Sequence, residues 1–472
     1  MRRSRLTSTQ VFLLVSALLI AALIGVLVSP TVLDGKGLFL AAAAIGGAAF
    51  VLLLVEETEL AILVLLASRA SLDLVANRRV GPLNVAAVLG LLVIAAGVLH
   101  MINRREVPSP RDPMFPYVLF LLVCVVSLVE TPDRLGGVKD LFRFTSLFFI
   151  YQLVGYVGRT ERGMRRVLAA IAISGIGPIL VGAYQLATGS GFTIKQGAFV
   201  RLEGTFVHPN PFSLYLALVL PALIATWIVV KEWRRWLGVI IVGLTICLVF
   251  TFTRTGWIGL VAAVLVMAWL RYRKILFVVP IVLAAVLFLI PGVGDRFSDL
   301  SSTESPSGTT TNSLDWRFAY WSEALQNVGE SPVWGQGLGY IKETTEEGKE
   351  AHNDFVRVLV ETGLAGFVLF VWAVGRLTKE SIAAVRRRRG TPLRSAVRVA
   401  FAGTMVAYLL MSLTSNLISQ PAVQWYFWSI MALAIYPTDP TDPESVAATA
   451  GAAGADASPR QSGTRTGVGA PT

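Results

Sequence analysis

The sequence is poor in the residue types from which metal and redox sites are built. Among its 472 residues are two cysteines and three histidines, and 15% of the residues are charged. Both cysteines, Cys124 and Cys247, fall inside apolar segments, so a disulfide framework is not indicated. No set of His, Cys, Asp and Glu has metal-ligand spacing, and no P-loop or dinucleotide-binding glycine motif occurs. The sequence therefore predicts no metal site and no cofactor.

Apolar residues, in contrast, make up 54% of the chain, and the mean hydropathy is +0.65. A soluble protein of this length cannot bury so large an apolar surface. Only α-helices satisfy the backbone of membrane-spanning segments in lipid, at ~20 residues each. We therefore expect an all-α, polytopic membrane protein with about 12–14 transmembrane helices and a large external helical loop. The predicted spans are 10–29, 37–55, 58–76, 83–103, 114–131, 140–158, 164–188, 209–230, 236–253, 255–270, 275–291, 354–376, 395–416 and 422–437.

The formal net charge of +11 fits a membrane topology better than a nucleic-acid surface. Basic residues concentrate in alternate loops, as they do on cytoplasmic faces: RREVPSPR, GRTERGMRR, KEWRRW, RYRK and RRRRG. This alternation predicts cytoplasmic termini, external loops at 189–208 and 292–352, and no nucleic-acid partner. The first span lacks a small-residue cleavage site, so we expect a retained helix rather than a signal peptide.

These features divide the chain into five parts. The tail is rich in Ala, Gly, Ser, Thr and Pro without an apolar period, which predicts disorder. The parts are a cytoplasmic N-terminus at 1–9, transmembrane helices over 10–291, an extracytoplasmic catalytic loop at 292–353, C-terminal transmembrane helices over 354–437, and a disordered cytoplasmic tail at 438–472.

The loop at 292–353 is the one long polar interruption of an apolar chain. Its segment DWRFAYWSEAL belongs to a predicted amphipathic helix that lies on the membrane. The apolar face of this helix comprises Leu314, Phe318, Trp321, Leu325 and Val328. A glycine-dense turn, ESPVWGQGLGY, follows this helix. His352 then directly precedes a new apolar helix, at the water–lipid boundary.

Three external residues could carry chemistry, and each also has a structural interpretation. Arg254 lies in a tight turn between two spans, where it either pairs with a bound anion or extends to lipid phosphates. Arg201 stands in an external loop, where exposed arginines are common. His352 is either a proton acceptor or a residue that merely precedes a helix capped by Asn353. Asn210, in the HPNP turn, is expected to cap the span that follows it.

Charged residues inside the predicted spans have a simpler interpretation. Arg69 and Asp73 are four residues apart, and Asp140 and Arg143 are three apart. Opposite charges at these helical spacings face each other, so we expect local ion pairs.

Together, two guanidinium groups and one imidazole on the outer side suggest a reaction. Arginine suits bidentate recognition of phosphate, and histidine suits proton transfer near neutral pH. Arg201 and Arg254 could neutralise a departing phosphate while His352 deprotonates a hydroxyl. The set therefore favours displacement at a phosphate-linked carbon.

Four motifs in this part of the chain resemble the O-antigen ligase/O-antigen polymerase superfamily of bacterial membrane glycosyltransferases. They occur in family order at family-like spacing, over roughly 190–375. The motifs are RLEGTFVHPNPFSLYLAL, TFTRTGWIGLVAAVLV, DWRFAYWSEAL with SPVWGQGLGY, and AHNDFVRVLVETGLAGFVLF.

The resemblance implies a GT-C-like, metal-independent, inverting transferase of the bacterial cytoplasmic (inner) membrane. Such enzymes pass a glycan from undecaprenyl pyrophosphate to a glycan, lipid or protein acceptor on the outer face, within membrane lipid. By the matching motifs, Arg201 and Arg254 bind pyrophosphate and His352 is the general base. The further candidate substrate-binding residues are Arg317, Trp321, Asn210 and Asn353.

Other classes of membrane protein remain open at this point. A transporter or flippase of polyisoprenoid-linked sugars also needs cations for pyrophosphate, but in a central cavity shared by both halves of the fold. The one-sided placement of the candidates favours the enzyme. A non-catalytic membrane scaffold leaves the Arg254 turn unexplained. Ligase, polymerase and protein O-glycosyltransferase are not separated by the sequence.

The alternating basic loops make a topology prediction. In a variant without Cys124 and Cys247, a cysteine at Ser307 should react with an impermeant thiol reagent in intact cells, because that loop faces outside. A cysteine at Ser462 should react only after lysis. The reverse labelling pattern would refute the orientation.

Overall fold

A computed structural model describes the polytopic helical fold. The described residues are 46–47, 50, 53, 56–80, 83–104, 110–193, 200–289, 313–345, 348–387, 390–444 and 446. The first predicted span and most of the second lie outside them, as do residues 292–312 of the external loop. Each later predicted span contains a helix, so the all-α, multi-pass fold class is confirmed. Seven helices of the described part are long and apolar enough to cross a membrane, by length and composition.

The helices follow the predicted spans closely. They are α3 (Thr58–Leu72), α4 (Val85–Arg104), α5 (Phe115–Ser127), α6 (Arg134–Gly158), α7 (Glu161–Ser174), α8 (Ile176–Thr188), α9 (Pro209–Val229), α10 (Arg234–Phe250), α11 (Arg254–Leu270), α12 (Ile275–Leu289), α16 (Asp354–Arg386), α17 (Pro392–Ser412) and α18 (Pro421–Ile435). The external loop contributes α14 (Ser313–Gln326) and α15 (Tyr340–Thr344). Two short antiparallel hairpins complete the described part: β1 (Arg79–Val80) with β2 (Leu83–Asn84), and β3 (Phe192–Thr193) with β4 (Val200–Arg201).

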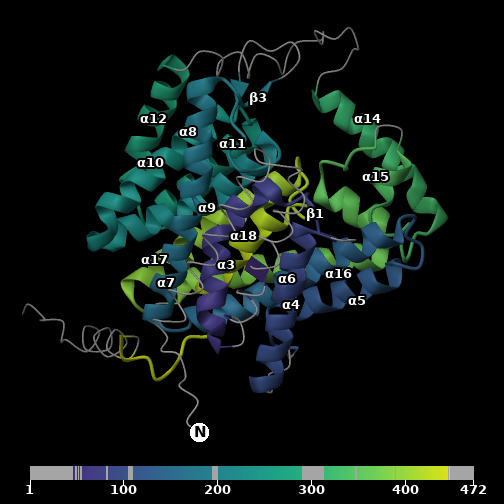
Figure 1. The fold of residues 1–472 in the computed structure, drawn as a ribbon, viewed down its shortest axis with the longest axis horizontal. Coiled ribbons are helices and arrows are strands. Elements are labelled where there is room, and N and C mark those ends of the chain that lie inside the picture. The colour runs from purple at the N-terminus through teal and green to yellow at the C-terminus, as the bar shows by residue number, and fades with distance from the viewer. Residues whose placement is uncertain are drawn as a thin grey trace, which may run out of the picture.

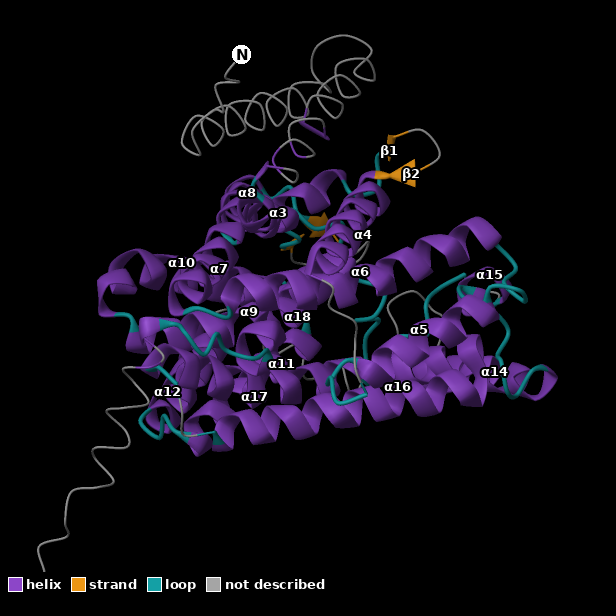
Figure 2. Ribbon diagram, turned by 90° about the horizontal axis from the view of Figure 1, so that it is seen from below, coloured by secondary structure: helices purple, strands orange, loops and turns teal. Residues whose placement is uncertain are grey.

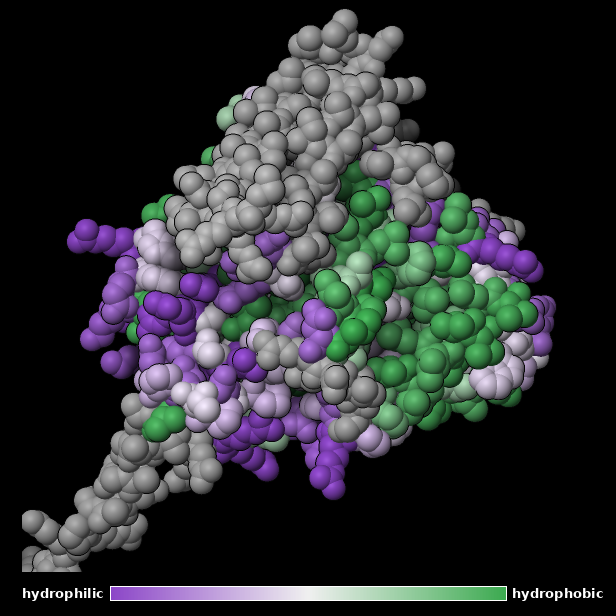
Figure 3. Space-filling model, turned by 60° about the horizontal axis from the view of Figure 1, so that its bottom comes forward, coloured by the Kyte–Doolittle hydropathy of each residue, from purple (hydrophilic) through white to green (hydrophobic). Residues whose placement is uncertain are grey.

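The most apolar helices form the centre of the bundle. α9 packs against α10, α11, α17 and α18, and most of its side chains are buried. A helix that is apolar on every side belongs in such a core. In Figure 1, α10, α11 and α12 lie on one side of this centre and the loop helices α14 and α15 on the other. Figure 2 shows α16 as a long helix along one side of the molecule. A broad hydrophobic area covers part of the surface in Figure 3, as expected of a surface in lipid.

One predicted span is divided by proline. The segment at 164–188 forms two helices, α7 and α8, with Gly175 between them. Pro178 lacks the backbone N–H that would bond to the carbonyl of Ser174, and its ring crowds that carbonyl. α7 therefore ends at Ser174.

A second predicted span is broken by the external loop. The helix expected at 354–376 begins at Asp354 but departs from helical geometry at Gly363, and it continues to Arg386. The loop backbone bonds into this break: Leu364 N donates to Pro332 O (2.8 Å), and Gly337 N donates to Glu361 O (3.0 Å). The break therefore docks the external loop onto the bundle.

Glycine is required where the loop and the break meet. Gly335 and Gly363 both have positive φ, at 78° and 63°. A Cβ on Gly335 would lie 2.4 Å from the backbone N of Gly363, which is shorter than any real contact. The glycine-dense turn seen in the sequence is thus the docking element of the loop.

Four of the basic loops gather at one end of the bundle. Arg394 donates to the carbonyls of Gly158 (2.9 Å) and Arg159 (3.0 Å), and Arg271 bonds to Ser395. A cleft joins the start of α7 to Trp233, in the loop between α9 and α10. The described start of the tail bonds here as well, because Asp439 N donates to Arg159 O (3.2 Å). The rest of the tail lies outside the described residues.

A buried ion cluster lies near the end of the bundle opposite the basic loops. Arg69 and Asp73 form the expected local pair (3.1 Å), and so do Arg143 and Asp140 (2.6 Å). Asp140, however, also accepts a bond from Arg357 of α16 at 2.8 Å.

Arg357 holds three elements together. It pairs with Asp140 of α6, with Glu361 of its own helix (3.0 Å) and with Glu350 of the external loop (3.0 Å), and it bonds to Ser419. Its side chain is 2% exposed. Because Glu350 stands two residues before His352, this cluster fixes the end of the external loop to the bundle.

Removing the arginine at the centre of the cluster should destabilise the fold. Arg357→Met leaves buried carboxylates without their partner, which typically costs about 3–5 kcal/mol. Arg143→Met is the matched control: its pair to the same Asp140 is 30% exposed on the arginine side and should cost under about 1 kcal/mol. Thermal unfolding of the two variants in detergent measures both losses of stability. Equal unfolding midpoints for Arg357→Met and the wild type would contradict the assigned role.

Candidate functional site

Arg201 is a buried residue at the mouth of the bundle rather than an exposed loop arginine. Its strand, β4, is held by the backbone bond from Leu202 N to Phe250 O (2.9 Å). The guanidinium donates to Thr251 O (2.8 Å) through Nε and to Thr253 Oγ1 (2.8 Å) and Asn210 Oδ1 (3.1 Å) through Nη2. Arg201 therefore joins the start of α9 to the turn before α11.

The cap of α9 differs from the prediction. His208, not Asn210, is the N-cap, because its Nδ1 accepts a bond from Asn210 N (3.1 Å). The predicted cap was wrong since two prolines flank Asn210 and draw it into the first helical turn, where Pro is favoured. Asn210 instead orients Arg201.

The hydrogen bond to Nδ1 also determines which ring nitrogen of His208 carries the proton. Burial and the nearby Arg201 charge lower the pKa of His208 to about 4, so the ring is neutral near pH 7. With Nδ1 accepting, the single proton resides on Nε2. His208 can therefore donate a hydrogen bond to an anion. Sequence reasoning missed this role of His208, because its buried, cationic surroundings are not readable from the chain.

Arg254 begins α11 after a tight turn. Thr253 is the helix N-cap, and Phe252 before it has φ 47°, a left-handed conformation that is rare for a large side chain. The turn is further held at Thr255, whose hydroxyl lies 3.5 Å from that of Thr414 after α17. Arg254 is thus fixed at the end of the bundle, beside Arg317 of α14, whose pKa is lowered by burial and by the Arg254 charge.

α14 shapes the loop that ends in His352. Tyr320 and Ala324 face the protein, and Trp321 Nε1 donates to Ala351 O (2.6 Å). Two residues of its predicted apolar face remain open, with Phe318 62% and Leu325 40% exposed. This exposure suits a helix that rests on lipid. Trp321 holds the backbone directly before His352.

His352 has a strained backbone and a cationic environment. Its φ is 51°, and the following Asn353 caps α16 by accepting from Phe355 N (2.9 Å) and Val356 N (3.2 Å), as predicted. Burial and the positive charges of Arg317 and Lys349, with a contribution from His208, lower the pKa of His352 to about 4. The imidazole is neutral near pH 7 and available as a base.

Asn416, between α17 and α18, completes the surroundings of His352. Its Nδ2 lies 3.3 Å from His352 Nδ1, while its buried Oδ1 has no hydrogen-bond partner among the described residues. Rotating the amide by half a turn exchanges the two atoms. Oδ1 then accepts from Nδ1–H, which leaves the lone pair of Nε2 for proton transfer. Sequence reasoning missed Asn416 because it is 64 residues from His352.

The structure thus brings most of the predicted site residues to one end of the bundle. Arg201 bonds to Asn210, and Arg254, Arg317 and His352 are electrostatic neighbours. α9, α11 and α16 all begin here, and each helix N-terminus adds partial positive charge. Helix N-termini and arginines both attract anions, so this arrangement suits an anionic ligand. Trp321 and Asn353, in contrast, make structural contacts in this arrangement.

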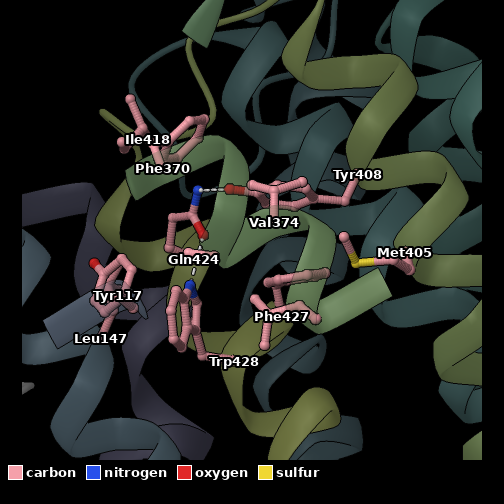
Figure 4. A pocket seen from close by; sticks show the side chains of 12 residues that line it. Tyr117, Leu147, Phe370, Val374, Met405, Tyr408, Ile418, Gln424, Phe427 and Trp428 are labelled. Carbon is pink, nitrogen blue, oxygen red and sulfur yellow. Dashed lines mark hydrogen bonds between the residues drawn. The ribbon is translucent and has the colours of Figure 1, made fainter. Parts of the chain in front are cut away.

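A small cavity lies in the interior of the part of the bundle that the structure describes. A cavity of about 20 Å³ lies between α5, α6, α16, α17 and α18, and Figure 4 shows Gln424 bonded within it to Tyr408 (3.2 Å) and Trp428 (3.0 Å). This volume holds about one water molecule.

Comparison with known proteins finds a family model that matches part of the chain. Residues 239–371 match the family model described as O-antigen ligase, a range that includes Arg254, Arg317, Trp321 and His352. The chain is also similar to an uncharacterized protein of Haemophilus influenzae. The two are 21% identical over 314 residues, which cover 60% of this chain and 76% of the relative.

The cationic environment of His352 predicts how the pKa of its imidazole responds to a bound anion. In the ligand-free protein its imidazole should titrate near pH 4, and a bound pyrophosphate should raise this pKa by offsetting the surrounding charges. NMR of histidine labelled with ¹³C measures both values, with His352→Gln to assign the signal. Arg317→Gln should also raise the pKa of His352. Titration near 6.5, unchanged by pyrophosphate, would contradict the geometry.

Proposed function

We propose that this multi-pass membrane protein transfers a glycan from undecaprenyl pyrophosphate to an acceptor hydroxyl at the outer face of the bacterial cytoplasmic membrane. The match of residues 239–371 to the O-antigen ligase family model supports this proposal. The observation that carries the proposal is the convergence of Arg201, Arg254, Arg317 and two neutral histidines on one set of helix N-termini. This end has the charge that a pyrophosphate requires.

The placement of the site relative to the basic loops supports the outer face. α9 begins at the site and ends beside the basic loop that contains Trp233. Its 21 residues extend about 30 Å, the thickness of a bilayer core. Since basic loops favour the cytoplasm, the site belongs to the opposite side.

The proposed reaction is a displacement at the anomeric carbon. The acceptor hydroxyl attacks that carbon while its proton passes to Nε2 of His352, and the bond from carbon to the pyrophosphate oxygen breaks with its electron pair on oxygen. Arg201 and Arg254 offset the charge that develops on the leaving group, and the Nε2–H of His208 can donate to it. The arginines supply the positive charge that the transfer needs, so the reaction is proposed to be metal-independent.

Substitutions of Arg254 and of His352 should impair different steps of the reaction. Arg254→Lys keeps a positive charge but loses the two-pronged geometry, so it should fold and still lose roughly 10²–10³-fold in turnover. His352→Ala should slow transfer by ~10²–10⁴-fold and leave donor binding intact, whereas Arg254→Ala should weaken donor binding. Binding of the lipid-linked donor and glycan transfer are measured at matched expression. Transfer at the wild-type rate in His352→Ala would remove the base from the mechanism.

Metal dependence offers a separate test. Purified protein should keep transferring glycan in excess chelator, because the guanidinium groups are proposed to neutralise the pyrophosphate. The control is a magnesium-dependent glycosyltransferase assayed in parallel, which the chelator should stop. Loss of activity in EDTA and recovery with magnesium or manganese would refute arginine-only activation.

A further inference from the structure

A second arginine cluster lies at the other end of the bundle and takes no part in the proposed reaction. Arg162, Arg165 and Arg166 line an open cleft of about 410 Å³ at the start of α7. Trp233 closes one side of the cleft, and the other lining residues are Ala169 and Glu444. The cleft is large enough for a phosphate-bearing headgroup of a lipid.

The arginines of this cleft keep donors for a ligand. Arg166 pairs with Glu59 at 2.7 Å, and Arg165 pairs with Glu161 at 3.6 Å. Each pair uses one nitrogen of a guanidinium that carries five N–H donors. The two side chains of the Arg166–Glu59 pair are about half exposed, so this ion pair contributes little to the stability of the fold. Arg162 is exposed, and it adds a third positive charge.

The surface next to the cleft is apolar. Ala169 and Ile173 follow Arg162 and Arg166 on one face of α7, at spacings of three and four residues. Ile173 is 48% exposed, and Val239 of α10, the helix that follows Trp233, is 74% exposed. The surface therefore changes from arginine to apolar side chains along the helix, as a lipid changes from headgroup to acyl chain. A tryptophan at this level is typical of a membrane interface.

We infer that this cleft binds the phosphate headgroup of an anionic membrane phospholipid, with the acyl chains along α7 and α10. Three arginines at a membrane surface favour an anionic over a zwitterionic headgroup. The apolar face beside the cleft favours a lipid over a soluble phosphate. The inference does not depend on the proposed function, because the cleft and the candidate site lie at opposite ends of α9.

The test measures lipid binding to the full-length protein in detergent by native mass spectrometry, with phosphatidylglycerol and phosphatidylcholine as probes. The double variant Arg162→Gln with Arg166→Gln removes two positive charges and should weaken phosphatidylglycerol binding roughly thirtyfold. The matched control, Arg273→Gln with Lys274→Gln, removes two exposed charges from another basic loop and should bind as the wild type does. Unfolding midpoints without lipid verify the fold, and Arg162→Gln alone replaces the double variant if its midpoint falls.

Three results would overturn the inference. One is unchanged phosphatidylglycerol affinity in the cleft variant, and another is an equal loss in both variants, which indicates diffuse surface charge. The third is displacement of phosphatidylglycerol by inorganic phosphate, which assigns the cleft to a soluble anion. A preference for phosphatidylglycerol that disappears only in the cleft variant supports the inference.

Discussion

The candidate site depends on the crowding of positive charge at one end of a helical bundle. Arg201, Arg254, Arg317 and Lys349 lie around His352 and His208, where three helices also begin. Burial lowers the pKa values of both histidines, and repulsion from the neighbouring positive charges lowers them further. A bound dianion would relieve this repulsion. Burial and the same charges keep His352 neutral in the ligand-free protein, and a bound anion would make its imidazole a stronger base.

Such an arrangement needs a rigid support, and the external loop provides it through two attachments. The turn at Gly335 docks into the break of α16 at Gly363, and Glu350 joins the buried cluster of Arg357. Glu350 stands two residues before His352, so this attachment holds the end of the loop against the bundle. The site is therefore built from a loop and several helix ends that are fixed to one another.

The sequence predicted the parts of this structure that depend on local pattern. The membrane helices, the Asn353 cap and the pairing of Arg69 with Asp73 follow from hydropathy and from spacings of a few residues. The features that it missed depend on tertiary contact. Asp140 and Arg357 are 217 residues apart, and the break in α16 results from a loop that bonds to its backbone. The cap at Asn210 was misplaced because its flanking prolines shift the helix start.

The central claim is that the arginine-rich end of the bundle holds the phosphates of a lipid-linked donor. A structure of the full-length protein with a non-hydrolysable polyprenyl pyrophosphate analogue tests it most directly. The account predicts phosphate oxygens within about 3 Å of the guanidinium groups of Arg201 or Arg254, with the anomeric carbon facing Nε2 of His352. A pyrophosphate bound at the opposite end of α9, in the cleft of Arg162, would contradict it.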